Sequence, residues 1–209
     1  MKSEIKLLAA FVLVLSALSQ PTRIAAADVD HFARRAVSAS FGSLDPSGCI
    51  YTAVDVTAAE QIDQNSPGTR EPSDWIFIHI FQADFCNNTV IHTASANEPL
   101  SESELDFTGR LNEAKLHTTV TLLDFDTNIP FEVTVDLMWT VNSSQLRDHF
   151  NSHFNFESCH FVLNDVASHR FAEVSGTVME RATNLTPAGS LLGGIIFTVK
   201  SHQVAHGCG

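Results

Sequence analysis

Four cysteines form two pairs, and each pair flanks a turn signal, which constrains the fold of this 209-residue chain more than any other feature. Cys49 and Cys86 flank Asn65-Ser66-Pro67-Gly68, and Cys159 and Cys208 flank residues 183–187. In a hairpin, residues equidistant from the turn face each other, and a disulfide can join them where the Cα atoms approach within about 7 Å. The spacing predicts two disulfides, Cys49 with Cys86 and Cys159 with Cys208.

The N-terminal segment has the composition of a secretory signal peptide. Lys2 and Lys6 precede an apolar run from residue 7 to residue 18, and the small residues Ala25-Ala26-Ala27 follow. The run is shorter than the roughly 18 residues that a membrane-spanning helix needs. We therefore expect residues 1–27 to be a signal peptide, residues 28–209 to be one domain without a membrane span, and the protein to be secreted or periplasmic.

The expected mature chain is strongly acidic. Loss of Lys2, Lys6, Arg23 and Glu4 with the leader changes the formal net charge from −12 to −14. A nucleic-acid partner is therefore excluded, because nucleic-acid binding depends on Lys and Arg contacts with phosphates. The remaining partner class is an extracellular ligand or protein.

Alternation of apolar and polar residues with period two dominates the chain. In the segment 131–141, Phe131, Val133, Val135, Leu137 and Trp139 share one face. This pattern predicts a half-buried antiparallel strand that forms a hairpin with residues 116–125. The segment 75–85 is apolar on both faces, so we expect a strand that is covered on both sides and in which His79 is buried. We also expect Trp75 of this segment and Trp139 of the segment 131–141 to pack inward.

The other segments with strand composition are regularly spaced. They are 32–44, 50–60, 89–96, 104–111, 149–156, 161–179 with a break, and 191–204. Short helical turns are expected only at 28–35 and 101–105. The pattern predicts an all-β, single antiparallel β-sandwich of the jelly-roll or immunoglobulin-like type, with about 9 to 11 strands.

Histidine is concentrated in the last third of the chain, and two pairs have a spacing that places them on one side of a strand. These are His149 with His153, and His202 with His206. The second predicted disulfide would bring the two segments together, so the four imidazoles are a candidate site for Zn or Cu. The alternative is that they are exposed members of polar strand faces.

The run Asp124-x-Asp126-x-Asn128 resembles the start of a calcium-binding loop, because short side chains with oxygen atoms alternate. Ile129 occupies the position where an EF-hand has glycine, and Pro130 follows. These two residues make calcium a less favoured cofactor than Zn or Cu. The alternative is an ordinary hairpin turn in which Asp and Asn bind their own backbone.

The sequence contains no Gly-x-Ser-x-Gly motif and no glycine-rich phosphate-binding loop, so no catalytic residue is assigned. Two function hypotheses follow. The first is an exported, non-catalytic β-sandwich protein that binds a ligand or another surface. The second is a histidine-rich protein that binds Zn or Cu, or an enzyme that depends on such a metal.

Overall fold

The computed structural model describes residues 29–65, 69–101, 103–108, 111–156 and 159–206. Within these ranges the chain forms strands and turns and no helix. The predicted leader lies outside the described residues. The described residues also lack any helix with the length and hydropathy that a membrane crossing requires.

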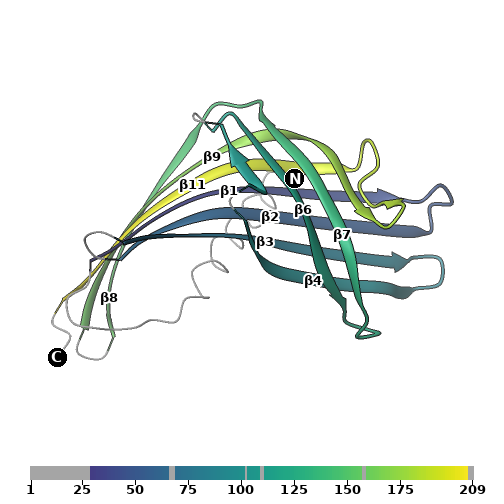
Figure 1. The fold of residues 1–209 in the computed structure, drawn as a ribbon, viewed down its shortest axis with the longest axis horizontal. Coiled ribbons are helices and arrows are strands. Elements are labelled where there is room, and N and C mark those ends of the chain that lie inside the picture. Colours follow the sequence, from purple (N-terminus) through teal and green to yellow (C-terminus); the bar gives the residue numbers. More distant parts are fainter. Residues whose placement is uncertain (1–28, 66–68, 102, 109–110, 157–158, 207–209) are drawn as a thin grey trace.

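The described strands all belong to one antiparallel sheet (Figure 1). They are β1 (Val29–Leu44), β2 (Ile50–Asn65), β3 (Thr69–Asp84), β4 (Thr89–Leu100), β5 (Leu105–Phe107), β6 (Glu113–Asp124), β7 (Pro130–Val141), β8 (Leu146–Phe156), β9 (Cys159–Glu180), β10 (Thr183–Asn184) and β11 (Leu191–His206). The antiparallel all-β class is therefore confirmed. A sandwich of the jelly-roll or immunoglobulin-like type stays a prediction.

The order of the strands closes the sheet on itself. The ladder runs from β1 through β2, β3, β4, β6, β7, β9 and β11 and returns to β1, while β5, β8 and β10 add to its margins. The narrowest junction joins β4 to β6 through only the pairs Ala94 with Asp124 and Ser95 with Leu123. Figure 1 shows β6 and β7 crossing over β1 to β4, so that the sheet has two facing layers.

Apolar side chains fill the space between the two layers, as the period-two pattern predicts. On β7 the residues Val133, Val135, Leu137 and Trp139 are all fully buried or nearly so, and their neighbours in sequence are exposed. The opposite layer contributes these buried residues: Val37, Ala39, Val54, Val56, Ile76, Ile78 and Ile80. Burial of such side chains is the main source of stability in a fold of this kind.

Two local expectations are wrong. The segment Val29–Arg35, expected as a helical turn, lies in β1, where the neighbouring strands β2 and β11 supply ladder partners on both sides. The expected break in 161–179 is also absent, because β9 is continuous from Cys159 to Glu180. Instead, β9 changes neighbours along its length: its first part pairs with β8 as far as His169 and with β11 as far as Phe171, and its second part pairs with β7 from Ala172 onward.

Candidate functional site

One face of the sheet points away from the core across β3, β2, β1, β11 and the start of β9. We call it the outer face. The registers align its members in rows across the five strands. They are Trp75, Phe77, His79 and Phe81 on β3; Ala53, Asp55, Thr57 and Ala59 on β2; Ala36, Ser38, Ser40 and Gly42 on β1; Gly193, Ile195 and Phe197 on β11; and His169 and Phe171 on β9.

The outer face is aromatic and poor in charge. Phe77 is 39% exposed and Phe171 is 43% exposed, at opposite ends of the same row of paired residues. Asp55 is the only Asp, Glu, Lys or Arg among its residues, although the chain contains 24 acidic and 12 basic residues. Arg34 borders the face, with its guanidinium 5.4 Å from the centre of the Trp75 ring. Charge depletion and aromatic enrichment are typical of the centre of a protein interface.

A row of polar side chains lies on β1, β2 and β3, towards one edge of the outer face. Ser40 Oγ donates a hydrogen bond to Asp55 Oδ1 at 2.6 Å, and His79 Nδ1 lies 3.9 Å from Asp55 Oδ2. In a nucleophile triad the serine is hydrogen-bonded to histidine, which removes its proton. Here the serine hydroxyl is hydrogen-bonded to the carboxylate, so the row lacks the contact between serine and histidine that defines such a triad.

The outer face corrects two expectations about β3. Trp139 is fully buried as expected, but Trp75 and His79 lie on the outer face and are only partly buried. The inner side of β3 is taken by Ile76, Ile78 and Ile80, which are fully buried. A strand that is apolar on both sides is normally covered on both sides. The apolar composition of both sides of β3 was the sequence signal for this face.

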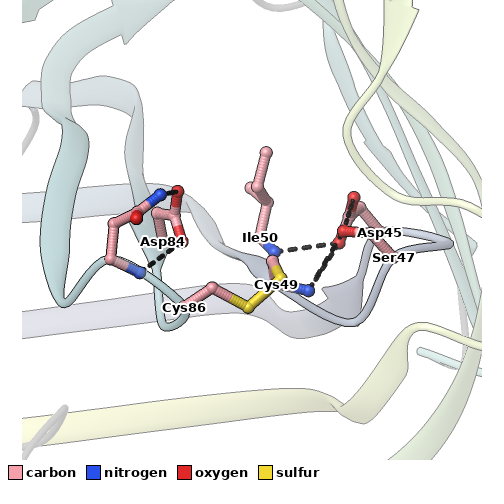
Figure 2. The surroundings of a disulfide bond; sticks show 7 residues. Asp45, Ser47, Cys49, Ile50, Asp84 and Cys86 are labelled. Carbon is pink, nitrogen blue, oxygen red and sulfur yellow. Dashed lines mark hydrogen bonds between the residues drawn. A yellow bond between two sulfur atoms is a disulfide. The ribbon is translucent and has the colours of Figure 1, made fainter.

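The first predicted disulfide is confirmed. Cys49 and Cys86 are bonded, with a Cα–Cα distance of 5.2 Å, at the ends of β2 and β3 (Figure 2). The ladder between these strands pairs Ile50 with Asp84, and the backbone N–H of Phe85 donates a hydrogen bond to the backbone oxygen of Cys49 at 2.8 Å, so the disulfide adjoins the end of this ladder. Cys208 lies outside the described residues, and so does the side chain of Cys159. The second disulfide therefore stays a prediction.

Carboxylates order the turns on both sides of this disulfide. Asp45 accepts hydrogen bonds from Ser47 Oγ at 2.6 Å and from the backbone N–H of Ile50 at 2.8 Å, and these contacts hold its pKa below the ordinary value. Asp84 accepts from the side-chain and backbone N–H groups of Asn87, which likewise lower its pKa (Figure 2). Both carboxylates are therefore ionised parts of turns.

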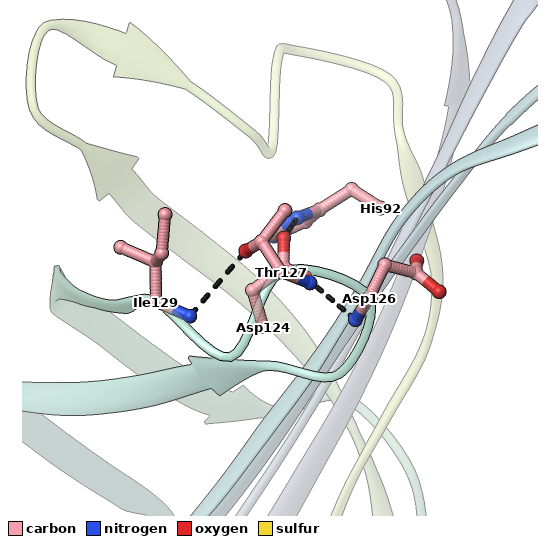
Figure 3. A network of polar contacts seen from close by, with 5 residues as sticks. All are labelled: His92, Asp124, Asp126, Thr127 and Ile129. Atoms are coloured by element: carbon pink, nitrogen blue, oxygen red, sulfur yellow. Dashed lines mark hydrogen bonds and ion pairs between the residues drawn. The ribbon is translucent and has the colours of Figure 1, made fainter.

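In the candidate calcium loop, the structure places Asp124 at the centre of a hydrogen-bonded turn (Figure 3). Its Oδ1 accepts from the backbone N–H groups of Asp126 and Thr127, both at 2.8 Å, and its Oδ2 lies 2.5 Å from His92 Nδ1. In Figure 3 the carboxylate of Asp126 points away from Asp124. Both carboxylate oxygens of Asp124 therefore already have hydrogen-bond partners within the protein. Calcium binding by Asp124, Asp126 and Asn128 stays a prediction.

The candidate Zn or Cu ligands lie on β8 and β11. His149 and His153 are exposed on β8, and the side chains of His202 and His206 lie outside the described part of the chain. The backbone of β11 pairs His202 with Asn164 and His206 with His160. Across the described side chains, no three His, Cys, Asp or Glu residues converge in a way that could hold a metal. The four-histidine site stays a prediction.

One contact near these residues was missed from the sequence. The rings of His153 and His160 are stacked, with centroids 5.9 Å apart, because β8 and β9 form a hairpin that pairs Asn155 with His160. The available signal was the presence of histidine in both of the neighbouring segments 149–156 and 160–169.

Comparison with known proteins shows little. No protein-family model matches the chain, and no curated protein matches it. Among solved structures, a protein from Nitrosomonas europaea provisionally named AttH is similar over 85% of this chain, with 9% sequence identity and a TM-score of 0.34. The similarity covers 52% of that structure, so this chain spans about half of its length.

Proposed function

We propose that the mature chain is an exported, non-catalytic interaction protein, and that it pairs with a second copy of itself through the outer face. The observation that carries this proposal is the aromatic, charge-poor surface, on which Asp55 and His79 lie side by side. Monomeric soluble proteins rarely expose contiguous apolar patches of more than a few hundred square ångströms. A flat sheet face of this kind can stack on another at a separation of about 10 Å.

The row of Ser40, Asp55 and His79 favours a second copy of the chain over a different partner. In a twofold-symmetric interface, each group on one copy meets the complementary group on the other. Asp55 accepts hydrogen bonds and His79 can donate one, and the two lie side by side on paired strands. A twofold axis between them would place each Asp55 against the opposite His79. The low charge of the face also limits repulsion between two acidic chains.

Export is supported by two observations. The first 27 residues have signal-peptide composition. The disulfide between Cys49 and Cys86 is of a kind that forms and persists in oxidising compartments.

Sedimentation of the mature protein over a range of concentrations tests self-association. We expect a dimer for the native protein, and a monomer for Phe77→Lys and for Phe171→Lys, since each buries a charge in the interface. Met138→Lys is the matched control, because Met138 is 38% exposed on β7, in the layer that carries none of the outer-face residues. A native protein that is monomeric at every concentration, or a control that dissociates as the test variants do, would contradict the proposal. Unchanged circular dichroism shows that the variants fold.

The second candidate function is metal binding. It is favoured by the contact between the rings of His153 and His160.

A further inference from the structure

His153 and His160 lie close together near the end of the hairpin that β8 and β9 form. Neither belongs to the outer face. His153 pairs in the ladder with Val162, and Asn155 pairs with His160, so the two imidazoles belong to adjacent rows. Their ring centroids are 5.9 Å apart with an angle of 28° between the ring planes. Both side chains are exposed, and an ion from solvent can therefore reach them.

A neighbouring amide favours one tautomer of the neutral His160 ring. Asn155 Oδ1 lies 2.7 Å from His160 Nδ1. The amide oxygen can only accept a hydrogen bond, so Nδ1 of the neutral ring carries the proton and Nε2 keeps its lone pair. Histidines that bind metals almost always donate the proton of their other ring nitrogen to an oxygen acceptor, which fixes the ring and its tautomer. His160 has this arrangement.

We propose that His153 and His160 form a two-imidazole site for a divalent transition metal, Zn²⁺ or Cu²⁺, with Asn155 as the residue that positions His160. Imidazole nitrogen suits both ions, and Cu²⁺ is the tighter binder in the general order of affinities. Water completes the coordination of an ion at an exposed pair. The proposal does not depend on pairing through the outer face.

The geometry separates this site from the set of four histidines predicted from the sequence. His149 and His153 are four residues apart on one strand, which places their Cα atoms about 13 Å apart. A metal–imidazole bond is only about 2.0 to 2.1 Å long. His160 is closer to His153 than His149 is, because the hairpin folds β9 back beside β8. The site therefore replaces His149 with His160 as the partner of His153.

Titration of the mature protein with CuCl₂ and ZnCl₂, followed by calorimetry, tests the site. We expect one strongly bound Cu²⁺ per chain, and weaker binding by about tenfold or more in His153→Ala, His160→Ala and Asn155→Ala. His149→Ala is the matched control on the same strand, and His117→Ala is a control at a distant exposed histidine; both should bind as the native protein does. Electron paramagnetic resonance of the Cu²⁺ complex should show two nitrogen ligands, and one in His160→Ala.

Three results would overturn the site: no stoichiometric binding of either ion, equal loss of affinity in His149→Ala and His160→Ala, or a native Cu²⁺ spectrum without two nitrogen ligands. The spectrum of the native protein decides the question even if a variant folds poorly. The readout is metal binding, so a negative result would not bear on the proposal that the outer faces pair. A monomeric protein that binds the ion would reject only the pairing of the outer faces.

Discussion

Trp139 on β7 donates a hydrogen bond from Nε1 to the backbone oxygen of Ser38 on β1, at 3.0 Å. The two residues are separated by 101 positions in the sequence, and their strands do not pair with each other in the sheet. The Trp139 ring is fully buried. This single contact therefore joins the layer that contains β7 to the layer that contains β1.

Replacing Trp139 with Phe should lower the free energy of unfolding by about 2 to 3 kcal/mol, because the variant loses the hydrogen bond and leaves a cavity. Urea denaturation measures the loss. Met138→Ala is the control on the opposite side of β7, where Met138 is 38% exposed, and we expect a change of about 0.5 kcal/mol or less. Equal stability of Trp139→Phe and the native protein would show that the contact does not hold the layers together.

Loss of the Cys49–Cys86 disulfide should also destabilise the fold. The bond closes a loop with a sequence separation of 37, for which the chain-entropy estimate is about 4 kcal/mol. Urea denaturation of the double variant Cys49→Ala/Cys86→Ala gives the difference from the native protein. Peptide mapping without reduction should recover Cys49 linked to Cys86, and the same map tests the predicted Cys159–Cys208 bond. A peptide linking Cys49 to Cys159 would reject both pairings.

The carboxylate of Asp124 should make stability depend on pH. Hydrogen bonds from the backbone N–H of Thr127, and then from that of Asp126 and from His92, hold its pKa below the ordinary 3.8. A lowered pKa in the folded state gives stability that is complete above the unfolded value and is lost as the pH falls through the folded value. Asp124→Asn should therefore be less stable than the native protein at neutral pH.

The difference between Asp124→Asn and the native protein should shrink as the pH falls below the ordinary carboxyl pKa, because the native carboxylate becomes protonated as the pH passes its lowered folded pKa. Urea denaturation at several pH values measures it. Asp126→Asn is the control, because the Asp126 carboxylate points away from the turn (Figure 3). A difference that persists unchanged at low pH would mean that Asp124 acts through its shape and not through its charge.

Two adjacent glycines on β11 should respond differently to alanine. A Cβ atom at Gly194 would lie 2.7 Å from the backbone oxygen of Ala172 and 2.3 Å from Val174 Cγ2, while a Cβ at Gly193 would meet nothing within 4 Å. Gly194→Ala should therefore lower the thermal midpoint and Gly193→Ala should leave it nearly unchanged. Calorimetry on the two variants compares them directly, and equal midpoints would contradict the close approach of β11 to β9.

Local sequence patterns predicted the strands that pair with their neighbours in the chain. The alternation in 131–141 identified the buried face of β7, and the symmetry of Cys49 and Cys86 about a turn identified the pairing of β2 with β3, although the observed register differs from that symmetry by one residue. Both signals work because a hairpin relates residues that are equidistant from its turn. The predicted site residues His149 and His153 lie on one strand as expected.

Patterns within one segment could not predict which strands meet across the fold. The two faces of β3 are both apolar, so composition does not distinguish Ile78 on the inside from Phe77 on the outside. The contact of His153 with His160 depends on the register of a hairpin, and the narrow junction of β4 with β6 depends on the path of the whole chain. These features depend on how one strand pairs with another, which the sequence of a single strand does not encode.

The exchange of neighbours along β9 has a consequence for how the protein loses its structure. Side chains on a strand alternate between faces, so a slip of one residue would turn Val174 and Val178 out of the core. The same slip would disrupt the pairing with β11 at the other end, because one uninterrupted strand serves both layers. We therefore expect a shift of one layer along β9 to disturb the other layer as well. Backbone amides in both should therefore exchange with deuterium through one shared, cooperative unfolding event.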